Sequence, residues 1–241
     1  MAPSSKDPGA SVAVQDYAKT IYVLTEHDGG AVGTTLLAER LGVSASSASG
    51  MIRRLDELGL VEHVPYRGVR LSPAGRELAL KMVRRHRLLE LYLVKALDLP
   101  WDQVHAEAEV LEHALSDQLE DAIAKKLGQP ELDPHGDPIP TRDGRVSDAA
   151  TVRLDEAAPG TVGELVRVSD TDPAMLRYLA EHAISLGDRI EVIDRVAFGG
   201  TVAVRVGVAP DDVFEQLGES LAAAMRIRVG AASTDQPATV V

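Results

Sequence analysis

Ten residues near the middle of the chain, VHAEAEVLEH at positions 104–113, place two histidines and three glutamates among apolar side chains. Imidazole nitrogens and carboxylate oxygens are ligands for divalent metals, and both groups also carry protons. On a helix that turns about 100° per residue, Glu109, Glu112 and His113 would lie within roughly 80° of His105, on one side. This geometry alone leaves two interpretations open: a metal site, or a charged helix face with two ordinary histidines.

The composition limits the chemistry of such a site. The chain of 241 residues contains no cysteine, which excludes disulfides, thiolate zinc sites and cysteine nucleophiles, so any metal must be held mainly by oxygen and nitrogen. It has no apolar run near 18 residues and therefore no expected membrane span. The start, MAPSSKDPGA, lacks an apolar signal core, so we expect a cytoplasmic protein with a flexible tail over residues 1–10.

Charge is distributed unevenly along the chain. The net charge is −12, but residues 1–87 contain 12 Lys/Arg against 9 Asp/Glu, whereas the remainder contains 13 against 28. A mildly basic first third is compatible with DNA binding, and an acidic remainder is compatible with cation binding.

The first third shows the pattern of a winged helix-turn-helix, which we expect over residues 11–76. Apolar residues repeat at helical spacing from about Val12 to Thr25. Two further helices follow, one from a threonine cap to Gly42 and one from a serine cap to Gly59. The segment LVEHVPYRGVRLSP then predicts a hairpin with Arg67-Gly68 at its tip.

The serine run SASSAS lies inside the apolar frame of the third helix, where a recognition helix would contact phosphates and base edges of double-stranded DNA. The candidate DNA-contacting residues of this helix and of the hairpin are Ser44, Ser46, Ser47, Ser49, Arg53, Arg54 and Arg67.

The rest of the chain predicts an α+β protein. Two long amphipathic helices, SPAGRELALKMVRRHRLLELYLVKAL and PWDQVHAEAEVLEHALSDQLEDAIAKKLG, suit dimerisation within residues 77–146. A linker is expected over 147–157. The strand-like segments GTVGELVRVS, DRIEVIDRV and GTVAVRVG predict a small β-barrel over 158–230, with PAMLRYLAEHAIS as a helical insert. Residues 231–241 are expected to form a second flexible tail.

Other histidines have weaker contexts. In HRLLE, His86 and Glu90 form an i, i+4 pair that alone is more typical of an ordinary core or surface contact. The segment DPHGDP at 133–138 looks metal-binding in composition, but its prolines favour a turn-rich linker. Four histidines are interpreted as structural or solvent-exposed: His27, His63, His135 and His182.

Taken together, YAKTIYVL, HRLLE, VHAEAEVLEH and GDPIP resemble the diphtheria-toxin-repressor family of metal-dependent transcriptional regulators, over about residues 12–230. The resemblance is greatest to the manganese-responsive branch that keeps a C-terminal SH3-like (FeoA-type) domain. It implies a repressor of metal-homeostasis (uptake) genes that binds operator DNA as a homodimer, with Mn²⁺ as cofactor and Fe²⁺, Co²⁺ or other divalent metals as possible substitutes. No membrane or small organic substrate is implied.

The resemblance also implies two metal positions per subunit. The regulatory position would take Asp16, Glu109, Glu112 and His113, with Asp16 and Glu109 standing where iron-sensing members carry Met and Cys. Metal there would tie the first helix to the dimerisation helix and so set the spacing of the winged helices on DNA.

The ancillary position would take His86, Glu90 and His105, together with a carboxylate from the SH3-like domain, either Asp170 or Asp172. The family adds a Gln three residues after that carboxylate, and neither register supplies it. Short manganese regulators also carry a metal-binding Glu where this chain has Lys19, which argues against a compact binuclear centre.

Three other functions remain as alternatives. The chain could be an iron-responsive member of the same family, a metalloenzyme such as a metallohydrolase or ferritin-like oxidase, or a metal buffer without a DNA role. The sequence shows no nucleophile–base pattern and no substrate-pocket signature, so we expect no enzyme.

Overall fold

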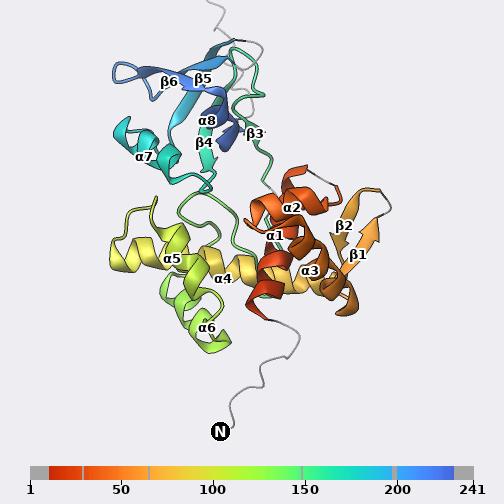
Figure 1. Ribbon diagram of the computed structural model, residues 1–241. Coiled ribbons are helices and arrows are strands. Elements are labelled where there is room, and N and C mark those ends of the chain that lie inside the picture. The colour runs from red at the N-terminus through yellow and green to blue at the C-terminus, as the bar shows by residue number, and fades with distance from the viewer. Residues whose placement is uncertain (1–10, 29, 65, 148, 197–199, 231–241) are drawn as a thin grey trace, which may run out of the picture. The chain divides into compact units, whose positions relative to one another are not determined.

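The computed structural model describes residues 11–28, 30–64, 66–147, 149–196 and 200–230 (Figure 1). Both expected tails, and the side chain of His27, lie outside the described part of the chain. None of the helices in those ranges is both long and apolar enough to cross a lipid bilayer. The chain forms two compact units; the first comprises Met1–Leu89, Glu107–Glu131 and Ile139–Val146, and the second comprises Glu90–Ala106, Leu132–Pro138 and Ser147–Val241.

The first unit begins with the predicted winged helix-turn-helix, and its order of elements is confirmed (Figure 1). These elements are α1 (Val12–Asp28), α2 (Thr34–Arg40), α3 (Ala45–Glu57), β1 (Val61–Val64) and β2 (Gly68–Leu71). They share one apolar core in which Ile21, Leu37 and Leu55 are fully buried. Because α1 contributes to this core, its position is mechanically linked to that of α3.

Local capping explains where these helices begin and end. Ser44 caps α3, since its hydroxyl accepts a hydrogen bond from Ser47 N at 3.1 Å, and Gly59 follows the helix with a φ of +69°. The threonine cap expected for the preceding helix is wrong: Gly33 occupies the cap position, without a side-chain hydrogen bond, and Thr34 is already helical.

The hairpin tip lies earlier than Arg67-Gly68. Gly68 is the first residue of β2 and pairs with Val64, so Arg67 belongs to the turn and Gly68 to the strand. The physical reason is a close approach: a Cβ on Gly68 would lie 2.0 Å from the carbonyl oxygen of Val32, and the residue has a φ of +113°. Glycine is therefore required where the strand passes the chain that precedes α2.

The fourth predicted helix is confirmed as α4 (Pro73–Leu97), but the fifth is wrong as a single helix. The structure divides it into α5 (Val104–Leu111) and α6 (Asp117–Lys126). Ser116 causes the break, because it adopts an extended conformation and caps α6 by accepting from Leu119 N at 3.2 Å. Glu112 and His113 consequently lie in the turn after α5 and not within a helix.

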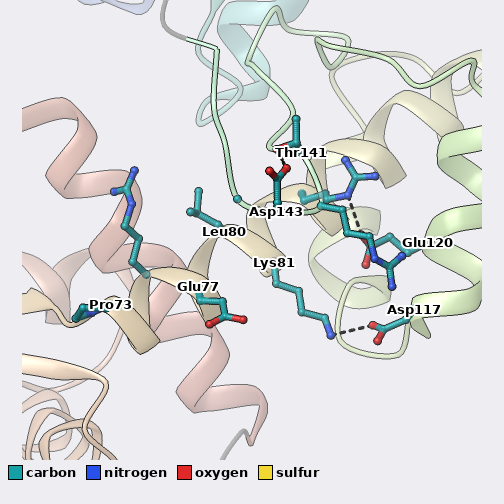
Figure 2. Close-up of a pocket in the computed structure, with 12 residues that line it drawn as sticks. Pro73, Glu77, Leu80, Lys81, Asp117, Glu120, Thr141 and Asp143 are labelled. Carbon is teal, nitrogen blue, oxygen red and sulfur yellow. Dashed lines mark hydrogen bonds and ion pairs between the residues drawn. The ribbon is translucent and has the colours of Figure 1, made fainter.

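A buried ion-pair cluster joins α4 to α6 in the first unit. Arg84 Nε and Arg85 Nε donate to the two carboxylate oxygens of Glu120, at 2.8 and 3.1 Å. All three residues are buried. Figure 2 shows the adjacent cavity, of about 510 Å³, with the more exposed Lys81–Asp117 pair at 2.8 Å on its wall.

The second unit is built on a six-stranded antiparallel sheet with strand order β3-β8-β4-β5-β6-β7. The strands are β3 (Val152–Arg153), β4 (Val162–Val168), β5 (Arg189–Arg195), β6 (Thr201–Val206), β7 (Val213–Gly218) and β8 (Met225–Val229). Strands β4, β5 and β6 correspond to the three predicted segments. β3 lies inside the segment expected to be a linker, where it pairs with β8.

Two helices complete the second unit. The predicted insert is confirmed as α7 (Pro173–Glu181), and a short helix, α8 (Glu219–Ala224), was not predicted. Leu176 and Leu179 of α7 pack into the same core as Leu165 of β4 and Ile190 of β5. This core fixes the segment that joins β4 to α7, which carries Asp170.

The Glu120 cluster generates a stability prediction. Glu120→Ala leaves two buried guanidinium groups without their shared carboxylate, and we expect the free energy of unfolding to fall by about 3–5 kcal/mol. Urea unfolding at fixed protein concentration measures this loss. Lys81→Ala is the control, because its ion pair is solvent-exposed and should contribute less than about 1 kcal/mol. Equal, small losses in both variants would contradict the structural role of Glu120.

Candidate metal centre

A fully buried carboxylate, that of Glu112, lies at the centre of the first cluster. Lys19 Nζ donates to Glu112 Oε1 at 2.7 Å, and His86 Nδ1 donates to Glu112 Oε2 at 2.6 Å. Lys19 comes from α1, His86 from α4, and Glu112 from the turn after α5. Since a buried charge is costly without partners, these contacts hold α1, α4 and the turn after α5 together within the first unit.

Lys19 neutralises a second carboxylate as well. Its ammonium group donates to Glu109 Oε1 at 2.7 Å, and the residue is only 9% exposed. Burial opposes its charge, but the adjacent Glu112 and Glu109 carboxylates raise the pKa of Lys19 above its ordinary value. The sequence flagged this position only as a departure from the family pattern; the structure shows a cation inserted between two of the expected metal ligands.

His113 is oriented by a residue that sequence reasoning missed. Its Nδ1 lies 2.7 Å from Gln15 Oε1, an amide oxygen that can only accept, so Nδ1 carries a proton. In the neutral ring, Nε2 is then the unprotonated nitrogen. That Nε2 lies 3.0 Å from Asp16 Oδ1 and 3.7 Å from Glu112 Oε1. Gln15 is adjacent to Asp16 on α1, and no sequence pattern distinguishes it from a surface glutamine.

This donor set fits a divalent metal. Asp16 Oδ1 is buried, and no residue that the structure describes donates a hydrogen bond to it. It faces an imidazole nitrogen, so two electron pairs meet unless a cation or a proton lies between them. Two ligand atoms bound at right angles to one ion at about 2.1 Å are about 3 Å apart, which matches the Asp16–His113 separation. One atom each from Asp16, Glu112 and His113 lies within 4.8 Å of the others.

The electrostatics agree with this arrangement. Burial raises the pKa of the Asp16 carboxyl above its usual value, and the neighbouring His113 and Lys19 only partly oppose the shift. A carboxylate in such a position gains from a nearby divalent cation, which stabilises its ionised form.

The second unit contains its own cluster of histidine and carboxylates. His105 Nδ1 lies 2.8 Å from Asp170 Oδ2 and 3.3 Å from Glu90 Oε1, and Glu90 is fully buried. Burial lowers the pKa of His105, but hydrogen bonds to Asp170 and Glu90 outweigh it and raise the pKa from 6.5 to about 10. Without metal, His105 is therefore an imidazolium that neutralises part of the cluster's negative charge.

The structure distinguishes between the two aspartates proposed for the SH3-like domain. Asp170 contacts His105, whereas the side chain of Asp172 caps α7 by accepting from Ala174 N at 2.9 Å. The Asp170 register is therefore the one whose carboxylate lies beside His105, and Pro173 then occupies the position of the family's Gln.

His86 occupies a place on α4 one turn before Glu90. Within the first unit, His86 Nδ1 lies 2.6 Å from Glu112 Oε2 and 3.9 Å from Glu109 Oε1. Because Nδ1 donates to Glu112, Nε2 is the nitrogen that could serve as a metal ligand.

The remaining histidines differ from one another. His63 is exposed, and its Nε2 lies 3.9 Å from Asp56 Oδ2. The ring of His182 stacks on that of Tyr178, and its Nδ1 donates a hydrogen bond to the Tyr178 carbonyl oxygen. His135, in contrast, is fully buried, and the DPHGDP segment around it is a tight, buried turn and not an exposed linker. The prolines correctly indicated turns, but local sequence could not show that the turn packs inward.

The candidate DNA-contacting residues are all exposed on the first unit. Ser44 caps α3 and lies within hydrogen-bonding distance of the Ser46 and Ser47 hydroxyls, so the serines form a polar tip at the start of this helix. Arg53 and Arg54 follow on the same helix, and Arg67 lies in the turn of the hairpin.

Three family models match the chain. The N-terminal DNA-binding domain of the iron-dependent repressors matches residues 11–69, and their metal-binding and dimerisation domain matches residues 72–141. The FeoA domain matches residues 152–229. The three matches together extend over most of the described chain.

Individual relatives agree with these matches. The iron-dependent repressor IdeR of Mycobacterium leprae is 34% identical over 193 residues, covering 77% of this chain and 78% of the relative. The diphtheria toxin repressor of Corynebacterium diphtheriae is 33% identical over 192 residues, covering 74% and 83%. A solved manganese-dependent transcriptional repressor in complex with manganese has a TM-score of 0.86 and 48% identity, covering 90% of this chain and all of that one.

The family models of the first two domains, and the relatives named above, are those of metal-dependent repressors. The chain therefore belongs to the iron-dependent repressor family, to which the diphtheria toxin repressor belongs, and is a metal-dependent, DNA-binding transcriptional repressor.

Proposed function

We propose that this repressor is activated by Mn²⁺ and controls genes for metal-ion uptake. The observation that carries the proposal is the donor set around His113. Asp16 and Glu112 supply carboxylate oxygens, and the chain contains no cysteine. Hard oxygen ligands with imidazole suit Mn²⁺, whereas softer sulfur ligands favour later metals. The relative solved with manganese supports the same choice.

The proposed regulatory ion is held by Asp16, Glu112 and His113, with Glu109 beside them. An ion supplies a double positive charge that draws the α1 carboxylate and the ligands after α5 together. Because Val14, Tyr17 and Ile21 of α1 pack in the core shared with α2 and α3, the position of α1 sets the position of the recognition helix. Metal thus acts through differential affinity for the DNA-binding conformation.

A homodimer would present two winged helices to the operator. Three apolar side chains on α5 and α6 are exposed: Val110, Leu111 and Leu119. Apolar side chains in this position suit burial against a second copy, and the family model for this region is that of a dimerisation domain. Two recognition helices separated by one helical turn of DNA would enter successive major grooves.

A second, ancillary ion is proposed at Glu90, His105 and Asp170 of the second unit. The support within the second unit is the close approach of His105 to both carboxylates. An ion there would replace the proton of His105 as the positive charge facing them.

Iron is the alternative activator. Two of the relatives are named for iron-dependent or diphtheria-toxin repression, although this chain is only about one-third identical to them. The preference for Mn²⁺ over Fe²⁺ rests on the ligands at positions 16 and 109, which are carboxylates in this chain.

His113→Ala tests the regulatory site. We expect metal affinity there to fall about 10–100-fold or more, and Mn²⁺-dependent DNA binding to be lost, while the dimer stays folded. The probe is a duplex selected from a random-sequence library by the wild-type protein with Mn²⁺, and binding is measured by fluorescence anisotropy. His182→Ala is the matched control, because that histidine contacts Tyr178 and belongs to none of the possible metal-binding groups found among the described residues.

Two outcomes would contradict this assignment. If wild-type binding is equal in chelator and in Mn²⁺, the protein is not activated by this metal. If His113→Ala is unfolded or monomeric by circular dichroism and sedimentation, His113 has a structural role.

Exchanging the hard ligands tests metal choice. Asp16→Met combined with Glu109→Cys introduces sulfur ligands, and we expect activation to shift from Mn²⁺ toward Fe²⁺ or Co²⁺. The measurement is affinity for the selected duplex across a series of divalent metals under anaerobic conditions. An identical ranking of metals for wild type and the double variant would show that selectivity does not arise from these two ligands.

The raised pKa of His105 predicts a pH dependence. In the metal-free protein the charged His105 ring adds to the free energy of unfolding. This contribution is complete below pH 6.5 and is lost as the pH rises toward about 10. At pH 7 a metal ion must displace the proton, so affinity should increase with pH. Calorimetry in buffers of different ionisation enthalpy should show about one proton fewer released by His105→Gln than by wild type. Equal proton release would contradict His105 as a ligand.

A further inference from the structure

We propose that Tyr66, at the tip of the β1–β2 hairpin, contacts operator DNA, with its ring against the sugar-phosphate backbone beside the groove that α3 enters. The inference rests on the DNA-binding function of the family and not on the identity of the activating metal. The side chain of Tyr66 is fully exposed, at 108%. Single apolar side chains are common on protein surfaces, so exposure alone would not distinguish this residue.

The backbone of Tyr66 is what distinguishes it. Its φ is +62°, and it is the third residue of a four-residue turn that the Arg67 N–H closes by donating to the Val64 carbonyl at 3.0 Å. A positive φ at this position of a turn favours glycine or asparagine, because a larger side chain is crowded there. A tyrosine in this conformation lowers stability, and its exposed ring gains no packing in return. Strain of this kind points to a function outside the folding of the hairpin itself.

The hairpin that carries Tyr66 is joined firmly to the recognition helix, and Figure 1 shows β1 and β2 beside α3. Val69 of β2 is buried in the core that also contains Ile52 of α3. The backbones of Val69 and Val32 exchange two hydrogen bonds, at 2.8 and 3.0 Å. On the other strand, His63 Nε2 lies 3.9 Å from Asp56 Oδ2 of α3. The hairpin and α3 therefore approach DNA as one body.

The charge beside Tyr66 suits a phosphate backbone. Arg67 follows it directly, is exposed, and is paired with no carboxylate among the described residues; Arg53 of α3 shares both properties. A helix that lies in the major groove, which is about 12 Å wide, has a phosphate backbone on either side. A hairpin that extends from the same core as the helix can meet one of these backbones.

The two side chains at the hairpin tip would divide the contact between them. The Arg67 guanidinium pairs with a phosphate, and the apolar ring of Tyr66 lies against the deoxyribose next to it. Such a contact is independent of base sequence, so it strengthens binding and fixes the orientation of α3 without reading bases. Burial of the ring against DNA would offset the cost of its strained backbone.

Tyr66→Gly and Tyr66→Asn test the contact, because both residues accept a positive φ and both remove the ring. The probe is a duplex selected from a random-sequence library by the wild-type protein in whichever divalent metal activates it most, so the result does not depend on manganese. We expect the affinity of both variants for this duplex, measured by fluorescence anisotropy, to fall about tenfold. The midpoint of urea unfolding should stay the same or rise.

Phe214→Ala is the matched control, because it removes another exposed aromatic ring, on β7 of the second unit, and should bind the duplex like wild type. Unchanged affinity in the two Tyr66 variants would overturn the proposal. A lower unfolding midpoint in both would show that the ring stabilises the protein without DNA, and would overturn it as well.

Salt dependence separates a direct contact of the ring from an indirect effect on Arg67. An uncharged ring neutralises no phosphate, so Tyr66→Gly should keep the wild-type slope of log affinity against log salt concentration. Arg67→Ala removes a phosphate contact and should reduce that slope by about one. Tyr66→Phe keeps the ring and should retain most of the affinity. A reduced slope in Tyr66→Gly, or equal losses of affinity in Tyr66→Phe and Tyr66→Gly, would overturn the proposed ring contact.

Discussion

Two fully buried carboxylates, Glu112 in the first unit and Glu90 in the second, impose the main constraint on this protein. A carboxylate cannot stay ionised in the interior without positive charge or several donors around it. Glu112 obtains both from Lys19 and His86, and Glu90 lies beside the His105 imidazolium. The helices α1, α4 and α5 are therefore connected through acidic groups, in addition to apolar packing.

The two units balance their buried charge in different ways. Lys19 is a permanent cation whose ammonium group is held by two glutamates. His105 carries its charge only as long as a proton remains bound, so a metal can replace that proton without moving a side chain away. In the cluster around Glu112, the Lys19 ammonium group stays next to the proposed ion. In the cluster around Glu90, the proposed ion would take the place of the proton on His105.

Sequence reasoning succeeded where structure is set locally. The serine cap of α3, the Ser-Pro start of α4 and the strand alternation of β4 to β6 were all readable from a few neighbouring residues. It failed where the apolar periodicity continues across a break between two helices. The helical pattern runs past Ser116, although this serine is the N-cap of a new helix, α6. The roles of Gln15 and His135 depend on residues far along the chain, which no local pattern contains.

Lys19 has a consequence for the range over which metal can regulate. Its contact with Glu112 already joins α1 to the turn after α5 before any ion arrives. A ligand shifts a conformational equilibrium only by the difference in its affinity for the two states. When the metal-free protein is partly organised by its own lysine, less of that difference remains for the ion to supply. We therefore expect a measurable basal occupancy of the operator and a shallower response to rising metal concentration.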